Sequence, residues 1–150
     1  MKLGIFSGIV LVAVMMASCC QCRKSSSFYD QFDKLVGTEW KLIQKDDKAF
    51  NVGGDNYTIA FGEDKRIFGM GDCNRYSGVM DYSVTRNVQS LSIGQLASTR
   101  MGCMDMAGEN QFFEFLRNAS SINVDDDLMV ITSKNAAQEK QRWVFEKIKK

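Results

Sequence analysis

Sulfur-bearing side chains gather in one short stretch of the chain, at Met101, Cys103, Met104 and Met106. Thioether and thiolate groups are the ligands that a soft ion such as Cu(I) selects, so this stretch offers a candidate metal site. Methionine also fills irregular gaps in hydrophobic cores. We interpret these methionines as packing residues, with Cu(I) binding or thiol redox chemistry as the alternative.

A second group of cysteines, Cys19, Cys20 and Cys22, contains the Cys-x-x-Cys spacing of thioredoxin-like proteins. That motif depends on a helix N-terminus, which lowers the thiol pKa, and here the cysteines precede a polar, shapeless stretch. We therefore do not interpret them as a redox site. For Cys20 and Cys22, further acylation, mutual bridging and oxidation stay open.

Groups for acid–base catalysis are scarce. The chain has no histidine, the commonest general base. The charged candidates near the central motifs are Asp72, Arg75, Arg100, Asp105 and Glu109, and the sequence gives no carboxylate separation that would define a catalytic pair. We expect the arginines to pair with carboxylates or carbonyls and so to order the loops. The expectation is a protein that is not an enzyme and uses no cofactor.

The N-terminus carries an export signal. Lys2 precedes an apolar run, residues 3–16, and small residues then lead to Cys19, the order of a secretory signal peptide and its cleavage site. As a helix the run measures about 21 Å, too short for a hydrocarbon core of roughly 30 Å. A cysteine at this point is similar to a bacterial lipobox. We expect cleavage after residue 18 and lipidation of Cys19, palmitate included, against the alternatives of an ordinary secretory signal or an uncleaved anchor.

Lipidation would divide the chain into a signal peptide (1–18), a polar tether (19–27) and a folded domain (28–150). Two or more acyl chains hold a protein stably on a bilayer. Because Cys20 rather than aspartate follows Cys19, sorting toward the outer membrane is expected, with the protein facing the periplasm. The formal net charge of +1 disfavours a nucleic-acid partner.

Alternating apolar and polar residues predict half-buried antiparallel strands over most of the domain. They are expected after Glu39 and around residues 57–61, 76–84, 90–93, 122–130 and 143–145. Turns are predicted at residues 51–56 and 62–65, and Asp125–Asp127 is predicted to connect two strands.

Two segments follow helical spacing instead. A short helix is predicted from Ser27 as N-cap to Gly37 as its end. A longer one is predicted over 106–118, with Asp105 as its cap and one apolar face made of Phe112, Phe113, Leu116 and Ala119. The fold class is therefore α+β, mostly antiparallel β, with the longer helix covering the sheet.

Four blocks in the same order resemble the META domain, or HslJ-like, family: residues 37–42, 71–78, 98–103 and 112–116. The likeness extends from Gly37 to about Lys147. It departs at Asp72, where the family often has glycine, and at Met104 and Met106, where proline is common. The resemblance implies a curved sheet or partly open barrel closed by one helix. It also implies a small envelope lipoprotein or secreted protein without established enzymatic activity.

The resemblance places Cys73 and Cys103 in family blocks, and an oxidising compartment favours a structural disulfide between them. Two free thiols or a redox switch are the alternatives. Asn74, Arg75 and Arg100 are candidate binding contacts. A likeness in outline to pilotin-type lipoproteins suggests a groove for an apolar ligand or an envelope protein. The expected function is a non-catalytic binding or accessory module, related to envelope stress or secretion.

Overall fold

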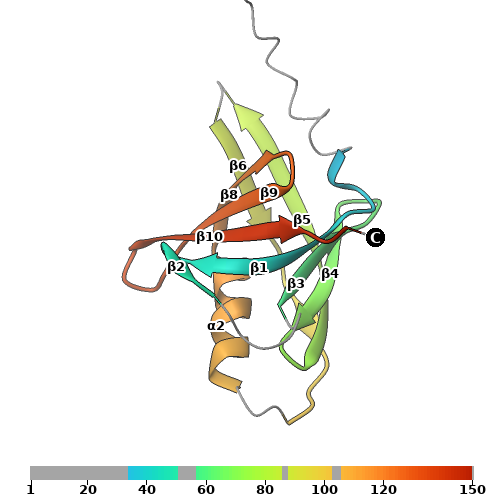
Figure 1. Cartoon of the computed structure of the whole chain (residues 1–150), viewed down its shortest axis with the longest axis vertical. Coiled ribbons are helices and arrows are strands. Elements are labelled where there is room, and N and C mark those ends of the chain that lie inside the picture. The colour runs from blue at the N-terminus through green and yellow to red at the C-terminus, as the bar shows by residue number, and fades with distance from the viewer. Residues whose placement is uncertain (1–33, 51–56, 86–87, 103–105, 150) are drawn as a thin grey trace, which may run out of the picture.

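The computed structural model describes residues 34–50, 57–85, 88–102 and 106–149 (Figure 1). Most of them lie in antiparallel strands, and helix α2 (Met106–Arg117) lies between β7 and β8 in the chain. The strands are β1 (Glu39–Lys45), β2 (Lys48–Ala49), β3 (Thr58–Phe61), β4 (Arg66–Gly71), β5 (Asn74–Thr85), β6 (Val88–Ile93), β7 (Ala97–Ser98), β8 (Ala119–Asp125), β9 (Leu128–Lys134) and β10 (Lys140–Lys147). None of the helices in these ranges has the length and apolar character needed to cross a bilayer.

The sheet curls into a nearly closed barrel. Its strand order is β6-β5-β4-β3-β1-β10-β9-β8, with β2 added beside β1 and β7 beside β5. The two end strands, β6 and β8, lie against each other, but no ladder joins them within the described residues. This unsealed seam confirms the partly open barrel that the family resemblance implies.

Helix α2 supplies much of the core. It contacts β4, β6 and β9, and it buries Phe112, Phe113, Phe115 and Leu116. The Phe115 ring stacks on the Trp143 indole with centroids 3.9 Å apart, while Phe112 meets Tyr57 and Tyr76 edge-on. Aromatic pairs in such geometries contribute about 0.5–1.5 kcal/mol each beyond burial. The helix therefore closes the barrel with its aromatic face.

Close strand contacts explain why β3 is buried on both faces. The alternating pattern predicted one exposed face, yet all four residues of β3 are buried. On β4, a Cβ added to Gly69 would lie 2.2 Å from the Thr58 carbonyl oxygen, so only glycine permits this approach. Phe68 lies opposite Ala60 in the ladder, and Ala60 is buried while Phe68 is half exposed. The expectation of a half-buried strand is wrong here.

The other predicted elements agree with the structure with two qualifications. Helix α2 matches the predicted 106–118, but Ala119, placed on the helix by its spacing, begins β8. Lys34 and Leu35 are helical and Gly37 has a φ of 78°, as expected of a helix end, while the earlier residues of that predicted helix lie outside the described ranges. The turn at 62–65 is present, and the predicted turn at 51–56 and the cap Asp105 also lie outside the described residues.

Candidate functional site

Asn74 occupies the centre of a buried polar cluster at the start of β5. Its side chain is 2% exposed and every polar atom of the amide is engaged. The Nδ2 group donates to Glu109 Oε1 at 2.9 Å and to the Met101 carbonyl at 3.2 Å. Its Oδ1 accepts from the Met101 N–H at 2.7 Å and the Thr99 hydroxyl at 2.8 Å. One amide thus joins β5, the loop after β7 and helix α2.

Glu109 is the acidic member of this cluster and lies in the first turn of α2. Its carboxylate is buried and accepts from both the backbone N–H of Asn74, at 3.2 Å, and the Asn74 side chain. A carboxylate near a helix N-terminus also complements the helix dipole. Glu109 therefore fastens the start of α2 to the β4–β5 hairpin.

The two predicted arginine contacts have exposed side chains. Arg75 uses its backbone instead, since its N–H donates to the Thr99 hydroxyl at 3.1 Å and its carbonyl accepts from the Thr99 N–H at 3.0 Å. The ion pairs recorded among the described residues involve neither Arg75 nor Arg100; they join Lys65 to Asp81, Arg142 to Asp47 and Lys149 to Asp127. Asn74 and Thr99, not the arginines, order the loop.

Two sulfur residues, Cys73 and Met101, contact this cluster: Asn74 Nδ2 lies 3.8 Å from Cys73 Sγ and donates to the Met101 carbonyl. Cys73 is disulfide-bonded. Cys103, its predicted partner, lies outside the described residues, as does Met104. The pairing of Cys73 with Cys103 therefore stays a prediction. Met101 and Met106 are each 57% exposed, which contradicts the interpretation of these two methionines as core packing.

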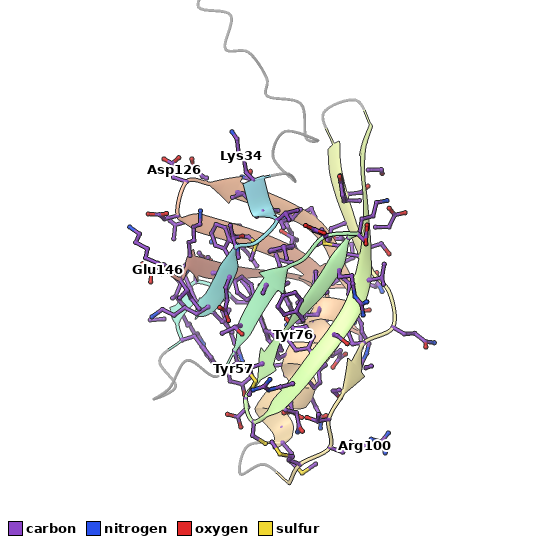
Figure 2. All side chains as sticks on the ribbon, turned by 90° about the vertical axis from the view of Figure 1, so that its right-hand side faces the viewer. Lys34, Tyr57, Tyr76, Arg100, Asp126 and Glu146 are labelled. Carbon is purple, nitrogen blue, oxygen red and sulfur yellow. The ribbon has the colours of Figure 1, made fainter. Side chains whose placement is uncertain are left out.

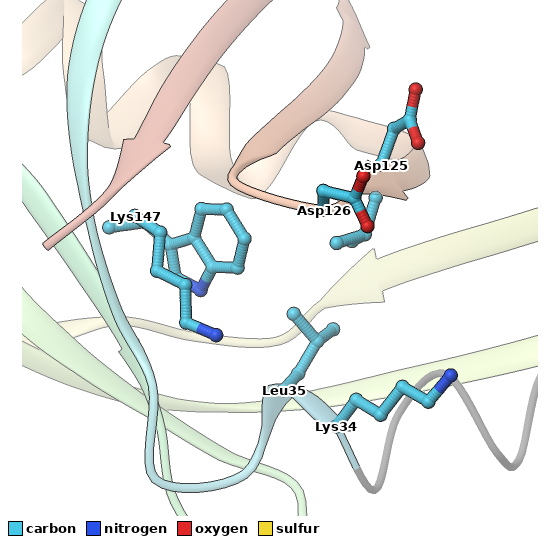
Figure 3. Close-up of a pocket in the computed structure, with 7 residues that line it drawn as sticks. Lys34, Leu35, Asp125, Asp126 and Lys147 are labelled. Carbon is cyan, nitrogen blue, oxygen red and sulfur yellow. The ribbon is translucent and has the colours of Figure 1, made fainter. Parts of the chain in front are cut away.

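The opposite end of the molecule carries a pocket that the sequence did not indicate. Figure 2 places Arg100 at one end of the molecule and Lys34 and Asp126 at the other. Between the start of β1, the β8–β9 turn and the end of β10 lies a cavity of about 430 Å³, here called the mouth pocket (Figure 3). It is lined by Lys34, Leu35, Trp40, Val124, Asp125, Asp126 and Lys147.

Trp40 forms the floor of the mouth pocket and is held rigidly. Its indole Nε1 donates to the Thr38 hydroxyl at 2.7 Å, and that hydroxyl donates to the Leu35 carbonyl at 2.5 Å. The Lys147 ammonium lies 5.9 Å from the centre of the indole ring. The pocket draws on three segments far apart in the chain, which is why spacing alone did not reveal it.

Charged residues beside the mouth pocket titrate abnormally because they are paired. Lys149 Nζ lies 2.8 Å from Asp127 Oδ2, and this hydrogen bond, reinforced by the charge of Lys149, lowers the pKa of Asp127. The same pair raises the pKa of Lys149. The pair of Asp127 and Lys149 joins the β8–β9 turn to the C-terminal segment.

In the core, burial raises the pKa of Tyr76, whose hydroxyl donates to the Thr58 carbonyl at 2.8 Å.

Comparison with solved structures supports the fold. An NMR structure of a protein from Burkholderia xenovorans is 20% identical, with a TM-score of 0.55 over 81% of this chain and 88% of that one. A second NMR structure is 22% identical, with a TM-score of 0.53 over 75% and 92% of the two chains. The crystal structure of a DUF4847 family protein from Bacteroides vulgatus is 12% identical, with a TM-score of 0.52 over 76% and 94%.

Sequence comparison identifies the family. No curated protein matched the chain. The family model described as the META domain matches residues 33–149, from just before the first described residue to the last one. The chain therefore belongs to the META domain family.

Proposed function

We propose that this protein is a lipid-anchored META domain protein of the bacterial envelope that acts as a non-catalytic binding or accessory module. The observation that carries the proposal is the export signal that ends directly before Cys19, followed within about fifteen residues by the folded domain. Acylation of Cys19 would hold the protein on a bilayer, with the outer membrane and a periplasm-facing orientation expected from Cys20.

The partner surface proposed is the end that carries Arg100, since it lies away from Lys34, where the chain leads to the anchor (Figure 2). Arg75, Arg100, Met101 and Met106 are all exposed. Methionine adapts to varied apolar surfaces, and arginine forms bidentate hydrogen bonds with carboxylates. These four side chains therefore suit an envelope protein whose surface has both acidic and apolar groups. Asn74 holds the loop that presents two of these residues.

A disulfide between Cys73 and Cys103 fits this role. Asn74 Nδ2 binds the Met101 carbonyl at 3.2 Å, so the residue after Cys73 contacts a residue two positions before Cys103. Cross-linking a loop of about thirty residues contributes roughly 3.6 kcal/mol at most. The bond would keep the partner surface in one conformation.

Metabolic labelling tests the anchor. Labelled palmitate should enter the wild-type protein, and Cys19→Ser should abolish incorporation and release the protein from membranes. Cys20→Ser is the matched control and should retain the label and the membrane fraction. Incorporation unchanged in Cys19→Ser, or an intact mass showing that Met1 is retained, would contradict the proposal.

Site-specific crosslinking tests the partner surface. A photoreactive residue at Arg100 should capture a discrete envelope protein in intact cells, whereas the same residue at Lys140, exposed on β10, should not. Equal products from both positions, or none from Arg100, would argue against a partner at this end.

A further inference from the structure

The mouth pocket has a balanced set of charges around an indole floor. Lys34 and Lys147 contribute two ammonium groups, and Asp125 and Asp126 contribute two carboxylates. Within the described residues, no recorded ion pair joins any of these four side chains to another. Figure 3 shows Lys147 on one side of the opening and Asp126 on the other. Positive and negative groups thus face the same opening from two sides.

The floor restricts what kind of ligand fits. Trp40 is 1% and Leu35 2% exposed, so the pocket offers little apolar surface to an acyl chain. A simple anion would meet two carboxylates, and a simple cation would meet two ammonium groups, each at a Coulombic cost. A small zwitterion avoids both costs. The cavity of about 430 Å³ lies within the usual size range of small-molecule sites.

We propose that the mouth pocket binds the phosphoethanolamine headgroup of a zwitterionic phospholipid. The phosphate lies toward Lys147 with Lys34 at the rim, the ammonium lies toward Asp126, and the glycerol rests at the edge of the floor. The choice of a lipid as the source rests on the proposed anchoring. About fifteen residues separate Cys19 from Lys34, a span of at most roughly 50 Å, so the pocket stays within reach of the bilayer surface.

A soluble headgroup allows the site to be tested apart from the anchor. We would titrate glycerophosphoethanolamine, which has no acyl chains, into the mature protein in uncharged maltoside micelles and follow the indole N–H resonances by NMR. The Trp40 signal should shift and saturate. The Trp143 signal should not move, because that indole is fully buried in the core. Absence of a saturable Trp40 shift would overturn the inference.

Variants distinguish a built site from general charge attraction. Asp126→Asn and Lys147→Gln should each weaken binding at least about fivefold; asparagine tolerates the φ of 48° at position 126. The matched controls Asp64→Asn and Lys140→Gln change the same charges at positions that do not line the mouth pocket and should leave binding intact. Equal losses in the controls would overturn the proposal.

One further ligand separates the charge contributions, and one variant separates the site from the anchor. Glycerol phosphate lacks the ammonium group, and equal affinity for it would show an anion site and refute zwitterion recognition. Cys19→Ser protein should bind glycerophosphoethanolamine as the wild type does. Failure of the headgroup site and failure of lipidation are therefore separate results, one read by NMR and the other by palmitate labelling.

Discussion

Lys45 lies directly opposite Trp143 in the β1–β10 ladder and holds its ammonium nitrogen 4.6 Å from the centre of the indole ring. The nitrogen is also 4.0 Å from the Phe50 ring centre and donates to Gln111 Oε1 on α2 at 3.3 Å. A register shift between Leu42 and Gln44 inserts one extra residue into β1, and such a bulge redirects the side chains that follow it. The bulge therefore aims a lysine at the aromatic core.

Replacing Lys45 with methionine should destabilise the protein. Lys45→Met retains a long flexible chain but removes the cation over the rings and the bond to Gln111, so we expect a loss of about 1–2 kcal/mol in the free energy of unfolding. Urea denaturation followed by tryptophan fluorescence measures it. Lys140→Met, on the exposed end of β10, should change stability by less than about 0.5 kcal/mol. Equal stability of Lys45→Met and the wild type would refute a stabilising role for the ammonium.

Removing the Asn74 amide should have a larger effect. Asn74→Asp preserves shape but turns a donor toward Glu109 into a second carboxylate, and it leaves the Met101 carbonyl without that bond. We expect a loss of roughly 2–4 kcal/mol at neutral pH. The repulsion raises the folded-state pKa of this acidic pair above its unfolded value, so the deficit should shrink as pH falls. Thermal unfolding from pH 7 to pH 4 reports both effects.

Two variants check that interpretation. Asn123→Asp, on the exposed face of β8, should cost little and show no such pH dependence. Combining Asn74→Asp with Glu109→Gln moves the amide from position 74 to position 109. The double variant should therefore recover part of the lost free energy of unfolding. A double variant no more stable than Asn74→Asp alone would count against the direct hydrogen bond as the cause.

The pair of Asp127 and Lys149 predicts a shift that is visible by titration. Its hydrogen bond lowers the pKa of Asp127, so the pair contributes to stability above the unfolded pKa of about 3.9, and this contribution disappears as pH falls through the lower folded value. Lys149→Gln should raise the pKa of Asp127 toward its ordinary value in an NMR carboxyl titration. Lys140→Gln should leave it unchanged. An unaltered Asp127 titration in Lys149→Gln would show that the pair does not persist in solution.

The sequence pattern predicted most of the strands and α2, because their apolar residues recur at the spacing of a single buried face. It missed β4, where Gly69 and Gly71 interrupt the alternation; a Cβ on Gly71 would lie 2.7 Å from the Phe113 ring. It also missed the inward direction of Lys45, since one bulged residue inverts the faces of β1. Asn74 was identified only as a possible contact, because its hydrogen-bond partners are about 25 to 35 positions away in the chain.

The cysteine pair separates a structural role from the soft-metal and redox alternatives. If Cys73 and Cys103 are joined, Cys73→Ser and Cys103→Ser should lower stability by the same amount, at most about 3.6 kcal/mol, and the double variant should be no worse than either. A strong reductant should lower the stability of the wild type to that of the serine variants, and a mild reductant should act slowly.

Met101→Leu and Met106→Leu should leave stability with and without Cu(I) unchanged, since both thioethers are exposed. Stoichiometric Cu(I) uptake that Met106→Leu abolishes, or rapid exchange of Cys73 with a small disulfide, would instead favour metal or thiol chemistry at this end of the barrel.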